Sequence, residues 1–156
     1  MNNQPTARTR ALRQARAASR LAAVQALYQH EMEGTPISAL LHEFHQHRLG
    51  ATIEDVEYAD ADIAFFDDIV QGVQDRRVEI DGIVTSKLSA GWSLERLDRP
   101  MRQILRAGTY ELLARADVPV AAVISEYLDV ADAFYDRREK GFVNGLLDAV
   151  ARQVRG

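Results

Sequence analysis

Arginine side chains near the start of the chain are the residues best suited to bind a ligand. Five of them precede the first carboxylate of the sequence: Arg8, Arg10, Arg13, Arg16 and Arg20. The guanidinium group is planar and always charged, and its fork of donors matches the oxygens of a phosphate group. If the first helix reaches upstream, Arg13, Arg16 and Arg20 share one of its faces. The pattern predicts a phosphate-binding segment, and the alternative is a solubilising tail without a ligand.

A second basic cluster lies toward the C-terminus, where Arg137, Arg138 and Lys140 stand between Phe134 and Phe142. Proteins that bind single-stranded nucleic acid combine cations with aromatic side chains, on which each stacked base contributes roughly 1–3 kcal/mol. The alternative is that both phenylalanines anchor the core on either side of a solvated loop. Together with the N-terminal arginines, this cluster favours RNA as the ligand.

The overall charge of the chain does not by itself suggest a polyanionic partner. Lys and Arg number 19 against 23 Asp and Glu, a formal net charge of −4, yet the first thirty residues hold five arginines and no acidic residue. Positive potential is therefore concentrated at one end of the chain. An Arg-rich, acid-free start is also typical of organelle transit peptides, but here it continues into a stretch with the apolar pattern of a structural helix.

Composition and motifs favour a protein without catalysis. The 156 residues contain no cysteine, which excludes disulfides and thiolate metal sites and is compatible with the cytoplasm. No apolar run approaches the ~18 residues of a membrane span, so we expect no membrane association. Sequence motifs for nucleotide binding, zinc hydrolysis and serine catalysis are absent, and no cofactor is expected.

Two groups of titratable residues are expected to be solvated rather than to bind a metal or take part in catalysis. His42, His45 and His47 could place two imidazoles on one helix face, but no further metal ligand stands at a recognisable spacing, so a solvated face is preferred and no metal is expected. Asp67 and Asp68 are neighbours in sequence and cannot converge on a helix, so we expect them on the solvent side of the third helix.

Helical periodicity runs along nearly the whole chain. Apolar residues recur at spacings of three and four, and no window alternates with period two. The pattern predicts a helix over 11–32, with Leu21, Val24, Leu27 and Tyr28 on its inner side, and a second over 36–48, followed by an acidic loop over 50–60. The stretch over 62–88 is one long helix or two with a break near 76–81. Further helices start at Asp98 and after Asp117, and the last carries Phe142 to Val154.

These elements make an all-α fold, a compact bundle of about seven helices with short connections. We expect residues 1–15 to form a flexible basic arm and residues 16–156 to form a single helical domain.

Short motifs occur in a fixed order along the chain. They are RLAAVQALY from Arg20 to Tyr28, WSLERL from Trp92 to Leu97, ILR at 104–106, YEL at 110–112, DVP at 117–119, Glu126, and FVNGLLD from Phe142 to Asp148. Each is weak alone, but the ordered set spans 16–154. In this set the chain resembles the NusB family of bacterial transcription antitermination factors.

The resemblance implies two packed helical subdomains and no catalytic activity. It implies binding of the single-stranded boxA element of nascent transcripts, notably ribosomal RNA leaders, together with the small-subunit ribosomal protein NusE. The complex would help RNA polymerase ignore terminators and would support ribosomal RNA synthesis. The implied RNA surface contains Arg16, Arg20, Tyr28, Phe134, Arg137, Arg138, Lys140 and Phe142, whereas Arg8, Arg10 and Arg13 are included from charge alone.

Two positions depart from the family pattern. Met101 stands where the family often has an acidic residue that helps to hold the ribosomal protein, so this contact is expected to be more apolar here. Arg138 stands where a small or acidic residue is common, which predicts a stronger dependence on phosphate contacts.

Two other functions remain compatible with the sequence. One is a self-associating helical interaction module, a homodimer that buries the arginine face. The other is a detached RNA-binding domain related to the N-terminal part of ribosomal RNA cytosine methyltransferases. Without a cofactor fold or a catalytic cysteine, the chain is not expected to be an enzyme by itself.

Overall fold

The computed structural model describes residues 6–47 and 56–156, with side chains for 6–46 and 63–156. Within these ranges the chain forms seven α-helices, one short 3-10 helix and no strand, which confirms the all-α prediction. The elements are α1 Ala7–Glu33, α2 Ile37–His47, α3 Val56–Asp75, α4 Arg77–Ser86, η1 Leu94–Arg96, α5 Arg99–Ala114, α6 Val120–Asp132 and α7 Arg137–Val154.

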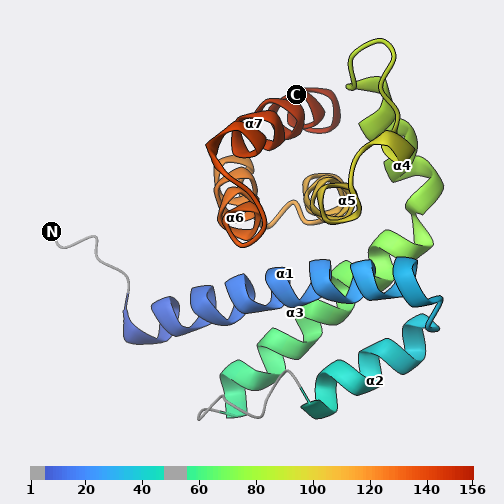
Figure 1. Cartoon of the computed structure of the whole chain (residues 1–156). Coiled ribbons are helices and arrows are strands. Elements are labelled where there is room, and N and C mark those ends of the chain that lie inside the picture. The colour runs from blue at the N-terminus through green and yellow to red at the C-terminus, as the bar shows by residue number, and fades with distance from the viewer. Residues whose placement is uncertain (1–5, 48–55) are drawn as a thin grey trace, which may run out of the picture.

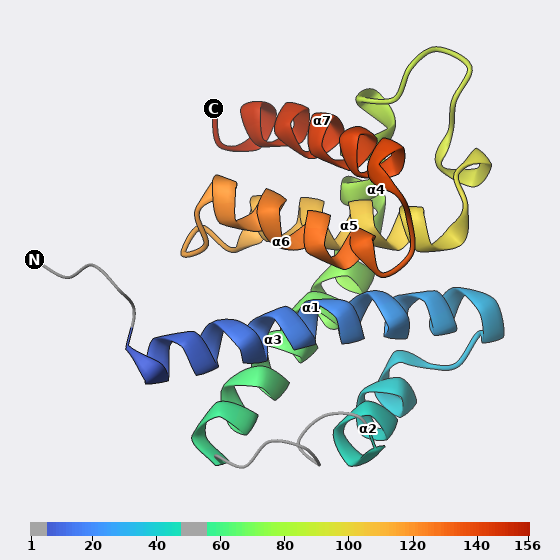
Figure 2. The same cartoon turned by 60° about the vertical axis from the view of Figure 1, so that its left-hand side comes forward.

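The helices pack as two groups, as the resemblance implied. Helices α1, α2 and α3 form one group and α4 to α7 form the other, and α5 contacts helices of both (Figure 1). The core between them holds fully buried Val24, Phe66, Ile104, Tyr127 and Leu147. Helix α6 runs alongside α1 in the same direction (Figure 2), and the two helices are in contact.

Helix α1 begins four residues before its predicted start. The side chain of Thr6 accepts a hydrogen bond from the backbone N–H of Thr9 at 3.1 Å and caps the helix. Residues 7–15, which we expected in a flexible arm, are therefore helical, while residues 1–5 lie outside the described part. The helix ends at Gly34, whose φ of 71° is left-handed and favours glycine.

The other boundaries follow local signals in the sequence. The long stretch after residue 62 is two helices, since α3 ends at Asp75 and α4 begins at Arg77. Helix α3 begins inside the predicted acidic loop, the first part of which lies outside the described residues. Asp98 caps α5, as predicted, by accepting from the N–H of Met101 at 3.1 Å. Helix α7 starts at Arg137, so the predicted loop over 137–140 is its first turn.

Asp67 and Asp68 have partners rather than a purely solvated position. Asp67 lies 2.6 Å from the Nε2 atom of His45, which joins α2 to α3. Asp68 accepts from the hydroxyl of Tyr110 at 2.6 Å and from Arg115 at 3.2 Å, which joins α3 to α5. The side chains of Asp67 and Asp68 remain 38% and 33% exposed, so the solvent-side prediction holds only in part. His42 is exposed, and the side chain of His47 lies outside the described residues.

No helix in the described ranges combines the length and the apolar character that crossing a bilayer requires.

Candidate nucleic-acid interface

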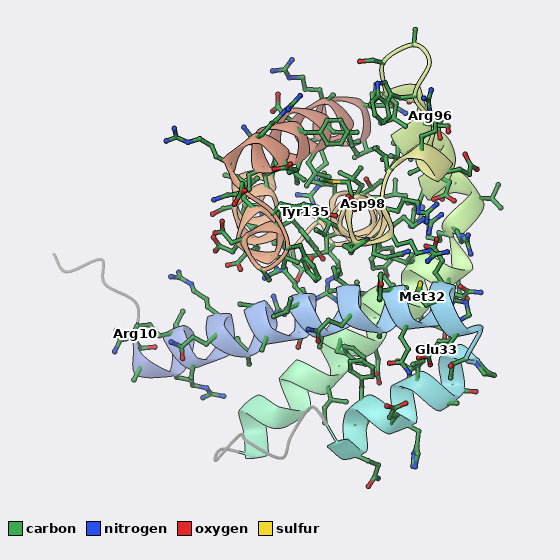
Figure 3. The ribbon with its side chains drawn as sticks, in the orientation of Figure 1. Arg10, Met32, Glu33, Arg96, Asp98 and Tyr135 are labelled. Carbon is green, nitrogen blue, oxygen red and sulfur yellow. The ribbon has the colours of Figure 1, made fainter. Side chains whose placement is uncertain are left out.

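Three of the predicted arginines line one groove between α1 and the start of α6. Arg13, Arg16 and Arg20 face Asp117 and Glu126 across this space of about 460 Å³, which we call the arginine groove. The predicted sharing of one helix face is therefore confirmed. Arg8, Arg10 and Arg13 are exposed, and Arg10 lies on the first turns of α1, toward the end that projects beyond α6 (Figure 3).

Arg20 lies inside the molecule rather than on the candidate surface. Its side chain is only 4% exposed, and its guanidinium donates two hydrogen bonds to Glu111, at 2.8 and 3.1 Å. Tyr127 donates to the same carboxylate, and Glu126 lies 3.7 Å from the guanidinium. Burial alone would lower the pKa of Arg20, but the hydrogen bond and the charge of Glu111 raise it above its ordinary value. Arg20 therefore holds α1 to α5 and α6.

Arg16 is half-buried at the floor of the arginine groove. Its guanidinium lies over the ring of Phe65, 4.6 Å from the centroid, and 3.9 Å from the carboxylate of Asp117. Burial and the nearby charge of Arg115 lower the pKa of Arg16, although a guanidinium still remains protonated. These contacts fix the side chain in place, so it can meet a phosphate with little loss of conformational freedom.

Tyr28 and Phe134 come together in a second pocket, of about 530 Å³. Tyr28 is 37% exposed and Phe134 is 39% exposed, so Tyr28 does not lie on the inner side of its helix as its apolar spacing suggested. We call this space the tyrosine pocket; it is lined by Gln25, Tyr28, Gln29, Met32, Glu33, Pro100 and Phe134.

Gln25, Gln29 and Met32 were missed in the sequence. With Tyr28 they occupy positions i, i+3, i+4 and i+7 of α1 and hence form one outward stripe. That spacing is present in the sequence, but it marks only a helix face that differs from the apolar one and does not indicate a pocket. Met32 and Glu33 are labelled at the end of α1 in Figure 3.

Phe142 and Arg138 line a third pocket, on the side where α7 approaches the start of α5. Trp92 is 53% exposed there, Phe142 is 40% exposed, and Met101 forms part of the lining. We call this space, of about 430 Å³, the tryptophan pocket. Arg96 lies over the indole ring of Trp92, 5.4 Å from its centroid.

The basic residues at the start of α7 differ in how far their charges are neutralised. Arg137 and Arg138 are exposed, whereas Lys140 forms an ion pair with Asp132 at 2.7 Å. An ion pair at this exposed position is weak and leaves the ammonium able to exchange partners.

The two basic clusters lie at opposite ends of α6. The arginine groove borders the start of α6, and the tyrosine pocket and the first turn of α7 follow its end. A helix of this length spans about 20 Å, so the clusters do not share a pocket wall but flank one strip along α1 and α6.

Asp98 fixes one wall of the tyrosine pocket. Its carboxylate caps α5, next to Pro100, and also accepts a hydrogen bond from the hydroxyl of Tyr135. Burial and this bond raise the pKa of Tyr135 well above its ordinary value. The ring of Tyr135 lies 6.2 Å from that of Phe134, so Asp98 holds Tyr135 next to Phe134.

The chain is similar in sequence and in fold to known proteins. A profile of the NusB family matches residues 17–152. The transcription antitermination protein NusB of Sphingopyxis alaskensis is 69% identical over 142 residues, which cover 91% of this chain and 95% of that protein.

Solved structures share the fold. NusB of T. maritima superposes with a TM-score of 0.73 at 32% identity, over 88% of this chain and 91% of that one. A chain in the crystal structure of antitermination factors NusB and NusE in complex with dsRNA has a TM-score of 0.75 at 24% identity, over 90% of this chain and 98% of that one. From the family profile and the sequence identity, the chain belongs to the NusB family.

Proposed function

We propose that this chain is a transcription antitermination factor that binds single-stranded boxA RNA of ribosomal RNA leaders, together with NusE, in the RNA polymerase antitermination complex. It works in the cytoplasm by binding alone, without catalysis. The observation that carries the proposal is the strip along α1 and α6, where exposed arginines at one end lead to two exposed aromatic rings at the other.

The chemistry of the strip suits a single strand. Exposed Arg8, Arg10 and Arg13 and the rigid Arg16 supply positive charge for phosphates. Tyr28 and Phe134 offer faces for unstacked bases, and Arg137 and Arg138 extend the positive charge beyond them. A duplex would bury its bases and leave these rings without a partner.

NusE is assigned to the tryptophan pocket. Its lining is mostly apolar, with exposed Trp92 and Phe142 around Met101, and such a patch is typical of a protein-binding site. In the NusB–NusE–dsRNA crystal structure a chain of this fold is assembled with both kinds of partner. Because Phe142 and Arg138 also belong to the implied RNA surface, the two partners would meet at this end of α7.

Binding of a labelled boxA RNA, measured by fluorescence anisotropy with and without NusE, tests the proposal. We expect the tightest binding with NusE present and a preference for boxA over a scrambled sequence of equal length. Tyr28→Ala should weaken binding, because stacking is lost, whereas Val78→Ala, at an almost fully exposed position of α4, should not. Equal affinity for the scrambled RNA in the presence of NusE would contradict the proposal.

The molar mass from light scattering on the same samples distinguishes the proposed RNA-binding adaptor from the homodimer alternative. A dimer that persists unchanged when RNA and NusE are added would favour a self-associating module instead. A mass that fits one chain with one NusE and one RNA supports the adaptor.

A further inference from the structure

The tyrosine pocket carries two amide side chains that the fold does not use. Gln25 and Gln29 stand on either side of Tyr28 on the outward stripe of α1. No hydrogen bond joins either amide to another described residue, whereas Gln71 is bonded to Asp75 at 2.9 Å. Each free amide presents one acceptor and two donor hydrogens to whatever enters the pocket.

Apart from Glu33, the rest of the lining is apolar. Met32 and Pro100 form one side, and the rings of Tyr28 and Phe134 form the others. A few convergent polar groups on an apolar, aromatic lining are typical of a site for a planar organic group. Stacking on these rings would hold such a group but would not identify it.

The charges around the pocket favour a phosphate less than those of the arginine groove. Glu33 is the one charged residue of the lining, and Arg99 lies at the rim, with its Nη1 atom 2.7 Å from the sulfur of Met32. The arginine groove is lined by three arginines, and Arg16 is separated from Tyr28 by about 18 Å along the helix. A bound strand would therefore place its backbone on the arginines and one base in this pocket.

The polar groups favour a base that carries an exocyclic amino group beside a ring nitrogen. Adenine and cytosine both present this pair to a glutamine amide, whose oxygen accepts from the amino group while its N–H donates to the ring nitrogen. Uracil can also pair with an amide, through its ring N–H and a carbonyl oxygen, but it has no amino group to donate to Glu33 at the rim. Adenine has a larger ring than cytosine to stack on Tyr28 and Phe134, so we expect adenine as the occupant.

We propose that the tyrosine pocket reads one unpaired adenine of the bound RNA, and that Gln25 and Gln29 determine this specificity. The inference rests on the proposed RNA-binding function but goes beyond it, because it assigns base discrimination to residues of this chain.

Competition among single-base probes tests the inference. The probes are 12-nucleotide oligouridines, unmodified or with one central adenine, cytosine or guanine, and their affinities are measured by fluorescence anisotropy at low salt. Wild type should prefer the adenine probe over unmodified oligouridine by about tenfold, the effect of one good bidentate pair. The Gln25→Leu/Gln29→Leu double variant should bring that ratio close to one and retain its affinity for oligouridine.

Gln153→Leu is the matched control, since Gln153 is also an exposed glutamine on a helix, at the far end of α7. It should leave the ratio unchanged, and circular dichroism should give the same helix content for all three proteins. If wild type binds all four probes equally, or if the double variant keeps the adenine preference, the inference is overturned and the proposed function stands. If wild type binds no RNA even with NusE present, both fall.

Discussion

The guanidinium of Arg20 in α1 donates two hydrogen bonds to the buried carboxylate of Glu111 in α5. The residues are 91 positions apart in sequence and belong to the two different helix groups. Both side chains are almost inaccessible, and Tyr127 donates to the same carboxylate from α6. One arginine of the basic segment is therefore part of the interior that unites the two halves of the fold.

Glu111→Leu should strongly destabilise the protein, because it leaves the charge of Arg20 buried without a partner. We expect the free energy of unfolding, measured with urea, to fall by about 3–5 kcal/mol. Asp148→Ala breaks the exposed ion pair with Arg152, 2.7 Å long, and should cost less than about 1 kcal/mol. Equal costs for the two variants would contradict the structural role of Glu111.

Replacing both Arg20 and Glu111 tests whether Arg20 contributes to RNA binding as well as to stability. The Arg20→Met/Glu111→Leu double variant removes both charges, so it should be far more stable than Glu111→Leu alone. Its affinity for boxA RNA, measured on folded protein, should stay within about twofold of wild type, because a buried guanidinium contacts no phosphate. A large loss of RNA affinity in a stable double variant would indicate that Arg20 contacts the RNA.

Arg13 and Arg16 should instead determine the salt dependence of RNA binding. Each phosphate contact to a single strand contributes about −0.7 to the slope of log affinity against log salt concentration. The Arg13→Ala/Arg16→Ala variant should therefore flatten the slope by about 1.4, measured between 50 and 200 mM salt. Arg152→Ala, which removes an exposed arginine at the far end of α7, should leave the slope as it is in wild type.

Two helical glycines should respond in opposite directions to alanine. A Cβ atom at Gly72 would overlap the ring of buried Tyr110, so Gly72→Ala should destabilise the protein by about 1–3 kcal/mol. Nothing lies within 4 Å of a Cβ atom at Gly82 in α4, so Gly82→Ala should stabilise it by about 0.5–1 kcal/mol through helix propensity. Thermal unfolding of both variants beside wild type provides the measurement.

The stability at alkaline pH should depend on Tyr110. Burial, followed by the hydrogen bond to Asp68, raises the pKa of Tyr110 to about 12, against about 10 for an unfolded chain. Its contribution is complete below pH 10 and is lost as the pH rises to 12, because only the unfolded state releases the proton in that range. Tyr110→Phe should lose less stability than wild type over this interval. Parallel unfolding curves for the two proteins would show that Tyr110 is not the titrating group.

The features that could be predicted from the sequence depend on residues close together in the chain. Asp98 caps a helix because its side chain reaches an N–H three residues later, and a neighbouring proline marks the same start. The aromatic and basic residue types of the candidate surface also follow from composition, and Tyr28 and Phe134 do lie in one pocket.

The features that sequence did not disclose depend on residues far apart in the chain. In the sequence Arg20 is indistinguishable from the surface arginines before it, because its partner Glu111 is 91 positions away. The sequence around Asp68 is typical of a solvated acid. Its partners, Tyr110 in α5 and Arg115 directly after α5, are more than forty positions away. The apolar spacing of α1 placed Tyr28 inside, but no other helix covers that part of the stripe, and its ring remains partly exposed.

Trp92 also gives the protein an intrinsic optical reporter. It is the one tryptophan of the chain, and it lies half-exposed at the rim of the pocket assigned to NusE. The tyrosine pocket contains no indole, so emission excited at the red edge of the absorption band arises from the other pocket alone. A blue shift on mixing would show, in unlabelled protein and in real time, that Trp92 and the neighbouring Phe142 become covered.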